Sequence, residues 1–108
     1  MELNLKKSGN AITIYLEGRL DVHLSADIEK EINKLISAES ASHFILNLKD
    51  VEYMSSSGLR IFVSTMRILK EKKRKLVLGN MNSAVKKIFE VVELTDMFDI
   101  VNNENEAL

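Results

Sequence analysis

The sequence predicts a single α/β domain whose mixed, mostly parallel sheet of four to five strands begins with a hairpin and carries packed helices. Three observations lead to this fold class. The chain has 108 residues, a length that fits one domain with one core. From residue 20 onward, helical patterns alternate with short apolar segments, an order typical of parallel sheets. Before them, two strand-like segments flank a turn and predict the hairpin.

The hairpin is predicted from alternation and turn chemistry. Leu3 and Leu5 alternate with polar residues, and segment 11–17 is rich in β-branched residues with one apolar face. Residues 8–10, Ser-Gly-Asn, are typical of a turn. The second strand is expected to end at 18–21.

A first helix is predicted next, with Ser25 as its N-cap. Asp27 and Glu29 lie in its first turn, where the helix dipole favours anions. Apolar residues at helical spacing form one stripe, and the polar segment 37–42 ends the helix. The stripe consists of Leu24, Ile28, Ile32, Leu35 and Ile36.

The middle of the chain predicts a buried strand followed by a second helix. Residues 44–48 are short, apolar and bounded by turn residues. Residues 49–54 are expected to connect this strand to three serines, Ser55–Ser57, and a glycine. An amphipathic helix then reaches residue 69, and the basic run 72–75 at its end is interpreted as a solvated helix terminus. Its apolar face comprises Leu59, Phe62, Val63, Met66 and Leu69.

The last third predicts a strand at 76–79, a third helix capped by Asn82 or Ser83, and a strand at 97–101. Residues 102–108 are expected to be a flexible tail, so one domain spans 1–108. The third helix should turn Val85, Ile88, Phe89 and Val92 inward. Nearly complete burial is predicted for Ile14, Leu16, Ile45, Leu46, Leu48, Phe62, Val77 and Phe89.

Composition excludes several classes of protein. The chain has no cysteine, so it forms neither disulfides nor thiolate metal sites, in keeping with a cytoplasmic location. Its net charge is −1, which predicts no attraction to nucleic acid or anionic lipid. No apolar run approaches the roughly 20 residues of a membrane span, and no signal-peptide pattern is seen at 1–7. We expect a monomer without cofactor.

Catalytic and metal sites are also not expected. Two histidines, His23 and His43, without cysteine or a zinc-binding helix motif do not make a metal site. Asp21, His23 and a serine of the run could be imagined as a hydrolase triad, but no Gly-x-Ser-x-Gly elbow is present. We therefore expect no enzyme activity.

The serine run has two physical interpretations. One or two of its hydroxyls could simply cap the second helix. A helix N-terminus also favours anions, so a phosphate attached there would be tolerated by the fold. Gly58 directly after the run lets backbone and partner approach closely.

The stretch from Phe44 to Leu59, FILNLKDVEYMSSSGL, resembles the signature of STAS domains, specifically the anti-sigma factor antagonists. That signature is an apolar strand, a short polar connection, and Asp-Ser-(Ser/Thr/Ala)-Gly-Leu opening a helix. Residues 17–21, EGRLD, are similar to the family's Gly-x-(Leu/Ile/Phe)-Asp, and residues 83–89 and 94–100 also resemble the sequence patterns of the family. The resemblance covers nearly the whole chain.

The resemblance implies a switch. In the family, an anti-sigma factor that is also a serine kinase phosphorylates the serine after the motif Asp, which is Ser56 here. Ser55 stands in place of that Asp, so Ser55 and Ser57 are kept as less favoured acceptors. The expected partners are this kinase and a metal-dependent Ser/Thr phosphatase. The expected partner-binding residues are Asp21, His23, Met54, Ser55, Ser56, Ser57, Gly58 and Leu59.

Two alternatives stay open beside the switch. The replacement of the motif Asp by Ser55 is compatible with a non-switching STAS scaffold in a signalling complex. A groove near Asp21 and the helix start could instead make the domain a sensor for a nucleotide or small anion.

Overall fold

Five strands form one sheet in the order β1-β2-β3-β4-β5 in the computed structural model, which describes residues 2–107. β1 pairs antiparallel with β2, and the other neighbouring strands pair in parallel. The predicted fold class is thereby confirmed. The elements are β1 Asn4–Ser8, β2 Ala11–Leu20, α1 Val22–Ala38, β3 His43–Met54, α2 Ser56–Glu71, β4 Lys75–Gly79, α3 Ser83–Val91, η1 Thr95–Met97, β5 Asp99–Val101 and η2 Glu104–Ala107.

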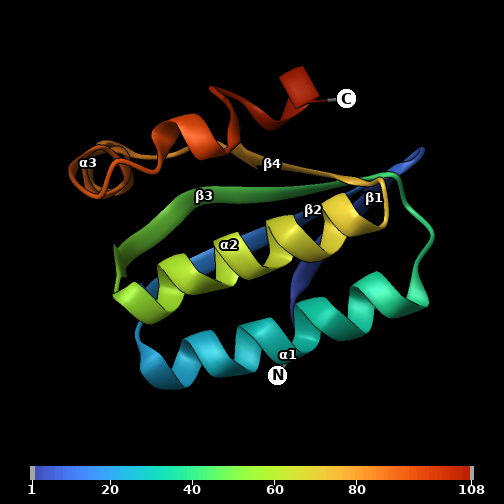
Figure 1. The fold of residues 1–108 in the computed structure, drawn as a ribbon, viewed down its shortest axis with the longest axis horizontal. Coiled ribbons are helices and arrows are strands. Elements are labelled where there is room, and N and C mark those ends of the chain that lie inside the picture. Colours follow the sequence, from blue (N-terminus) through green and yellow to red (C-terminus); the bar gives the residue numbers. More distant parts are fainter. Residues whose placement is uncertain (1, 108) are drawn as a thin grey trace.

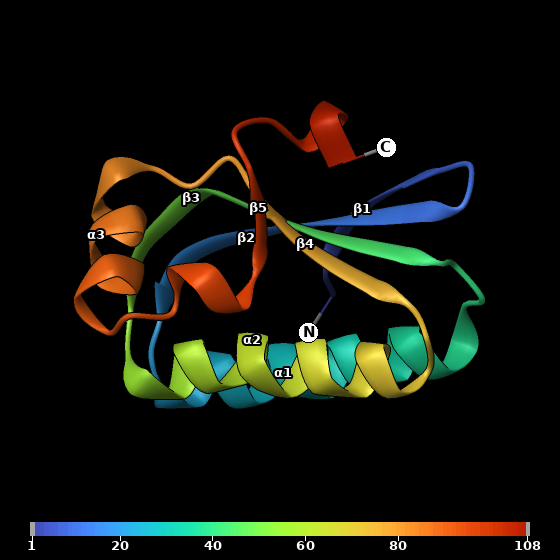
Figure 2. The ribbon, with the colours of Figure 1, turned by 45° about the horizontal axis from the view of Figure 1, so that its top comes forward.

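The helices α1 and α2 lie side by side on one face of the sheet, and α3 packs at one end of it (Figures 1 and 2). The main core lies between these helices and the sheet. Phe89 of α3 joins it by stacking on Phe62 of α2, with ring centres 6.0 Å apart. Within residues 2–107, no helix is long and apolar enough to span a bilayer.

The predicted core is confirmed, and it is divided between the two faces of the sheet. All eight side chains predicted to be buried are buried. Ile45 and Val77 lie apart from the main core, in a small cluster with Ala11. Val101 and Ala107 of the C-terminal segment pack against this cluster, so the second face is covered by the end of the chain.

The first helix begins earlier than predicted. Its N-cap is Asp21, whose Oδ1 accepts a hydrogen bond from the backbone N–H of Leu24 at 3.0 Å. Ser25, the predicted cap, is buried inside the helix instead. Both residue types are good caps, and the choice is decided by where β2 ends, because Leu20 is its last residue.

The third strand extends beyond the predicted segment 44–48 to Met54. The predicted connection is strand because it pairs in parallel with β2 as far as Met54, and two of its side chains, Val51 and Met54, are buried. Its pairing with β2 shifts register twice, and Gly18 of β2 lies at the second shift with φ of 82°. That left-handed conformation favours glycine, which accounts for the glycine at this position.

In the region after β4, one of the two predicted caps of α3 is confirmed, and the prediction is wrong at two other places. Asn82 is the cap of α3, and its Oδ1 accepts from the N–H of Val85 at 2.9 Å. Val92, predicted to turn inward, is exposed because it follows the last helical residue. Met97 lies in η1, so the last strand, β5, is shorter than the predicted 97–101.

Arg74 corrects the interpretation of the basic run as a solvated helix end. Its guanidinium donates hydrogen bonds to the carbonyls of Ile36, Glu39 and Ala41, which lie at and just beyond the end of α1. It also lies 5.3 Å from the centre of the Phe44 ring. Helix carbonyls without intrahelical partners favour such a cation, so Arg74 ties the end of α1 to the end of α2.

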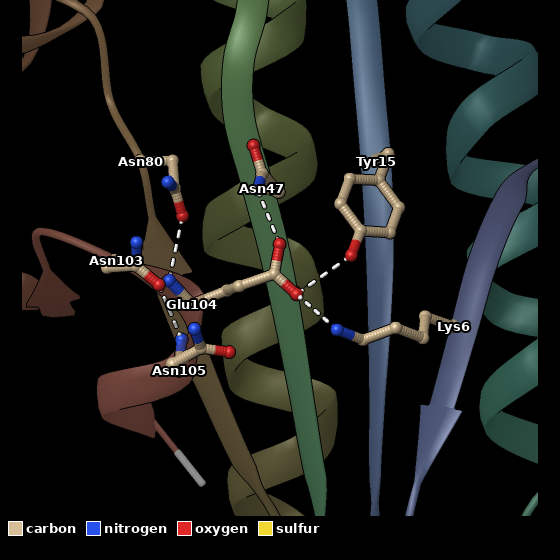
Figure 3. A network of polar contacts seen from close by, with 7 residues as sticks. All are labelled: Lys6, Tyr15, Asn47, Asn80, Asn103, Glu104 and Asn105. Carbon is tan, nitrogen blue, oxygen red and sulfur yellow. Dashed lines mark hydrogen bonds and ion pairs between the residues drawn. The ribbon is translucent and has the colours of Figure 1, made fainter.

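The end of the chain, predicted to be a flexible tail, forms η2 and packs on the sheet. Glu104 accepts hydrogen bonds from Tyr15 at 2.8 Å and Asn47 at 2.9 Å and forms an ion pair with Lys6 at 3.1 Å (Figure 3). The backbone N–H of Glu104 donates to Oδ1 of Asn80 at 2.8 Å. Polarity alone predicted fraying, but these contacts come from β1, β2, β3 and the residue after β4. Leu108 lies outside the described residues.

Candidate phosphoacceptor site

The serine run lies where β2 and β3 end together. β4 pairs only with the first part of β3, so the last residues of β2 and β3 form a two-stranded extension. Leu20 pairs with Met54 at its tip, and one residue later α1 and α2 are capped. The extension therefore places the N-termini of two helices beside each other (Figure 1).

The hydroxyl of Ser55 is hydrogen-bonded within the fold. Its Oγ donates to the carbonyl of Leu20 at 2.8 Å and accepts from the backbone N–H of Gly58 at 3.4 Å, which makes it the N-cap of α2. Its own N–H donates to the same Leu20 carbonyl at 3.0 Å. Ser55 thus joins the start of α2 to the end of β2, and its half-buried hydroxyl is already bonded twice.

Ser56 is the exposed serine of the run. It is the first residue of α2 and is exposed, whereas Ser57 is half-buried. Within residues 2–107, the Ser56 hydroxyl makes no hydrogen bond with another residue. The free N–H groups and the dipole at the N-terminus of α2 favour negative charge at this position.

Gly58 and Leu59 pack the first turn of α2 onto the extension. Gly58 is buried, and a Cβ at this position would lie 3.0 Å from Cβ of Leu20 and 3.0 Å from Cγ of Met54. This close approach, rather than an unusual backbone conformation, accounts for the glycine. Leu59 is half-buried and packs against the main core.

Asp21 and His23 lie on the neighbouring helix start, and both are exposed. The Asp21 carboxylate caps α1 through Leu24, and within residues 2–107 it makes no hydrogen bond to His23. The arrangement needed for a hydrolase triad, an acid orienting a histidine, is therefore not formed by these two residues. Their exposure leaves both side chains accessible beside the serine run.

Met54 is only 3% exposed, so it belongs to the core rather than to an accessible surface. Its neighbour Tyr53 is 41% exposed on the other side of the strand, and the Arg19 guanidinium lies 4.5 Å from the centre of its ring. The sequence pattern does not predict this pair, because residues 49–54 are polar enough to be expected as a connection rather than a strand. If these residues are assigned to a strand, the alternation of side chains places Tyr53 on the face opposite to that of Met54.

A groove of about 980 Å³ adjoins the extension on the side of α3. Its acidic lining residues are Glu17, Asp50 and Glu52, and its one lysine is Lys49. Three carboxylates around one ammonium group disfavour a nucleotide or other anion. The part of the chain described by the structure also contains no cluster of three potential metal ligands of the His, Asp or Glu type.

Comparisons with known proteins agree with this geometry. The STAS domain family matches residues 2–107. The chain belongs to the STAS domain family. The anti-sigma-B factor antagonist of Bacillus subtilis is 30% identical over 100 residues, which cover 93% of this chain and 90% of that protein. The solved structure of the unphosphorylated anti-sigma factor antagonist SpoIIAA is 26% identical, with a TM-score of 0.81, over 98% of this chain and 92% of that one.

β3 leads directly into the serine run at the start of α2. In this STAS domain Ser55, directly after β3, is the cap of α2, and Ser56, the first residue of α2, is exposed. The structure of Bacillus SpoIIAA in its phosphorylated form is also similar, with 25% identity and a TM-score of 0.73 over 98% of this chain and 96% of that one.

Proposed function

We propose that this STAS domain is an anti-sigma factor antagonist that binds an anti-sigma factor serine kinase and thereby releases a sigma factor. Phosphorylation of Ser56 by the kinase ends the binding, and a metal-dependent Ser/Thr phosphatase restores it. The domain acts in the cytoplasm and has no catalysis of its own. The observation that carries this proposal is that the Ser56 hydroxyl is exposed and makes no hydrogen bond to another of residues 2–107, whereas the neighbouring Ser55 hydroxyl is bonded to Leu20 and caps α2.

Ser55 in place of the family's usual Asp is compatible with the proposal. Ser and Asp are both strong N-caps, and Ser55 fills the capping position of α2. The replacement therefore preserves the local geometry that holds Ser56 at the first helical residue. The similarity to SpoIIAA, a protein with structures in unphosphorylated and phosphorylated forms, supports a fold that tolerates a phosphate.

The physical basis of the switch is desolvation. A protein interface of standard size buries roughly 1,600 Å² in total. A phosphoserine carries about −1.5 to −2 charges, and burying it without cationic partners is unfavourable. A penalty of about 4 kcal/mol would weaken binding roughly a thousandfold. Phosphorylation does not reduce the stability of the folded domain, because the N-terminus of α2 favours negative charge.

We expect incubation with the kinase and ATP to add one phosphate, measured by intact mass and located by peptide fragmentation. Ser56→Ala should accept no phosphate yet still bind the kinase, whereas Ser55→Ala and Ser57→Ala should still be phosphorylated. Phosphate on Ser55 or Ser57 in the wild type would show that our choice of acceptor is wrong. No phosphate on a wild-type chain that binds the kinase would favour the scaffold alternative.

An acidic substitution should imitate the phosphorylated state. Ser56→Asp is expected to keep thermal stability, because a carboxylate near a helix N-terminus is favourable by about 0.3–1 kcal/mol. It should weaken kinase binding, measured by calorimetry in the presence of ADP, by at least about tenfold. Asn33→Asp on α1 adds the same single negative charge at an exposed position and is the control, and equal losses for both variants would contradict a local switch.

A further inference from the structure

We propose that Arg19 and Tyr53 form a docking surface beside Ser56, and that it receives a carboxylate and an apolar side chain of the anti-sigma factor serine kinase. The inference rests on the proposed function and names the part of the surface that selects the partner. Neither residue is among those that the sequence pattern assigned to partner binding.

The two residues stand on the outer side of the two-stranded extension. Arg19 of β2 pairs with Tyr53 of β3, one position before the tip at which Leu20 pairs with Met54. Leu20 and Met54 are buried beneath α1 and α2, so alternation turns Arg19 and Tyr53 away from the core. Ser56 follows Tyr53 by three residues, which places the pair and the phosphoacceptor at the same end of the sheet.

Tyr53 differs from every other aromatic side chain of the protein. The chain has two tyrosines and four phenylalanines and no tryptophan. The phenylalanines are buried, and Tyr15 is half-buried with its hydroxyl bonded to Glu104. Tyr53 alone among these side chains is exposed, and its hydroxyl has no hydrogen-bond partner within residues 2–107. Exposed tyrosine and arginine are the residue types in which the binding energy of protein interfaces concentrates.

The side chain of Arg19 is ordered by Tyr53 and can bind an anionic group of a partner. Its guanidinium lies 4.5 Å from the centre of the Tyr53 ring, within the range of a cation–π interaction. Among residues 2–107 it forms no ion pair, although it is exposed. The cation–π interaction orders the guanidinium, and its N–H donors make no hydrogen bond within residues 2–107, so less side-chain entropy is lost when a carboxylate binds.

The surrounding charges define the partner further. Glu17 and Asp21 flank Arg19 along the chain, and Glu52 precedes Tyr53, all three exposed. A complementary surface therefore places cations around one carboxylate that faces Arg19, with an apolar side chain against the Tyr53 ring. An acidic residue of the partner that faces Glu17, Asp21 or Glu52 instead of Arg19 would be repelled, so the position of Arg19 contributes to the choice of partner.

The test measures the dissociation constant for the serine-kinase anti-sigma factor of the source organism that binds and phosphorylates the wild-type chain. Tyr53→Ala should weaken binding by at least about tenfold, and Tyr53→Phe should keep it within about twofold. Arg19→Glu should weaken binding more than Arg19→Gln, because charge reversal adds repulsion. In a double-mutant cycle, the effects of Tyr53→Ala and Arg19→Gln should be non-additive.

Leu5→Ala is the control, since Leu5 is 39% exposed on β1, which pairs with residues 11–15 of β2 and not with the extension. It should leave binding unchanged, and thermal melting should show that all variants are folded. If the kinase binds wild type and Tyr53→Ala equally well, the docking surface is wrong and the proposed function stands. If no serine-kinase anti-sigma factor of the organism binds the wild-type chain, the proposed function fails and the docking surface fails with it.

Discussion

At the serine run, hydrogen bonding distinguishes side chains that are chemically identical. Ser55 donates to Leu20, 35 residues away in the sequence, and caps α2, whereas Ser56 one residue later is exposed. A hydroxyl bonded in this way is a poor acceptor of phosphate, because the transfer would break the contact that joins β2 to α2. Accessibility and bonding together favour Ser56.

Gly58 gives a prediction about side-chain size. Gly58→Ala should lower the free energy of unfolding by about 1–3 kcal/mol, because the added Cβ overpacks a close contact. That Cβ would meet Leu20 and Met54 at 3.0 Å each. Urea unfolding measures the loss, and Ser57→Ala on the same turn is the control. A loss of the same size at both positions would contradict the steric explanation.

Among the secondary-structure elements, α2 and α3 end in the same way. After α2, Lys73 has φ of 58° and the N–H of Arg74 donates to the carbonyl of Leu69 at 2.8 Å. After α3, Glu93 has φ of 58° and the N–H of Leu94 donates to the carbonyl of Phe89 at 3.0 Å. These bonds are the Schellman motif, which usually places glycine at the left-handed position.

Glycine at these two positions should therefore stabilise the domain. Lys73→Gly and Glu93→Gly are each expected to raise the free energy of unfolding by about 0.5–1 kcal/mol, since the left-handed conformation is strained for residues with a Cβ. Lys72→Gly is the control, because Lys72 has φ of −88° and glycine there only adds freedom to the unfolded chain. Urea unfolding should show opposite signs at 72 and 73, and a loss at all three positions would refute the prediction.

For the domain as a whole, Glu104 connects the end of the chain to the sheet face opposite α1 and α2. Partial burial acts to raise the pKa of this carboxyl, but hydrogen bonds from Tyr15, Lys6 and Asn47 outweigh it and lower the pKa. The hydrogen bond to Glu104 in turn raises the pKa of Tyr15 and that of Lys6. The network therefore favours the ionised carboxylate and the protonated phenol and ammonium.

The sign of the resulting pH dependence follows from these directions. A carboxyl with a lowered pKa in the folded state contributes stability above its unfolded pKa of about 4.3, and this is lost as pH falls through the folded pKa. Glu104→Gln should lower the free energy of unfolding near neutral pH by about 1–2 kcal/mol. The difference between wild type and variant should shrink as pH falls below about 4.3, as measured by urea unfolding.

Glu106→Gln is the control for this experiment, because Glu106 lies in the same η2 segment but is exposed. It should change stability little at any of these pH values. A difference between wild type and Glu104→Gln that stays constant down to pH 3 would show that the lowered pKa contributes nothing to stability.

Local periodicity was sufficient to predict the order of elements, the buried faces and the serine run at a helix start. Ile14, Leu46 and Phe62 are buried as predicted because their spacing matches a strand or a helix, and burial follows from that spacing. The polar run 102–107 was misjudged because its anchors, Tyr15 and Asn47, are far away in the sequence.

Only the tertiary structure decided which serine caps α2 and which neighbour of the run is exposed. The pattern of the chain places three serines before a glycine, but the Leu20 carbonyl engages Ser55 and leaves Ser56 in solvent. The continuation of β3 to Met54 likewise buries that methionine and exposes Tyr53. The physical reason is the same in both cases: periodicity reports which face of an element is apolar, whereas the partner of a polar group depends on which distant backbone atom the fold brings within hydrogen-bonding distance.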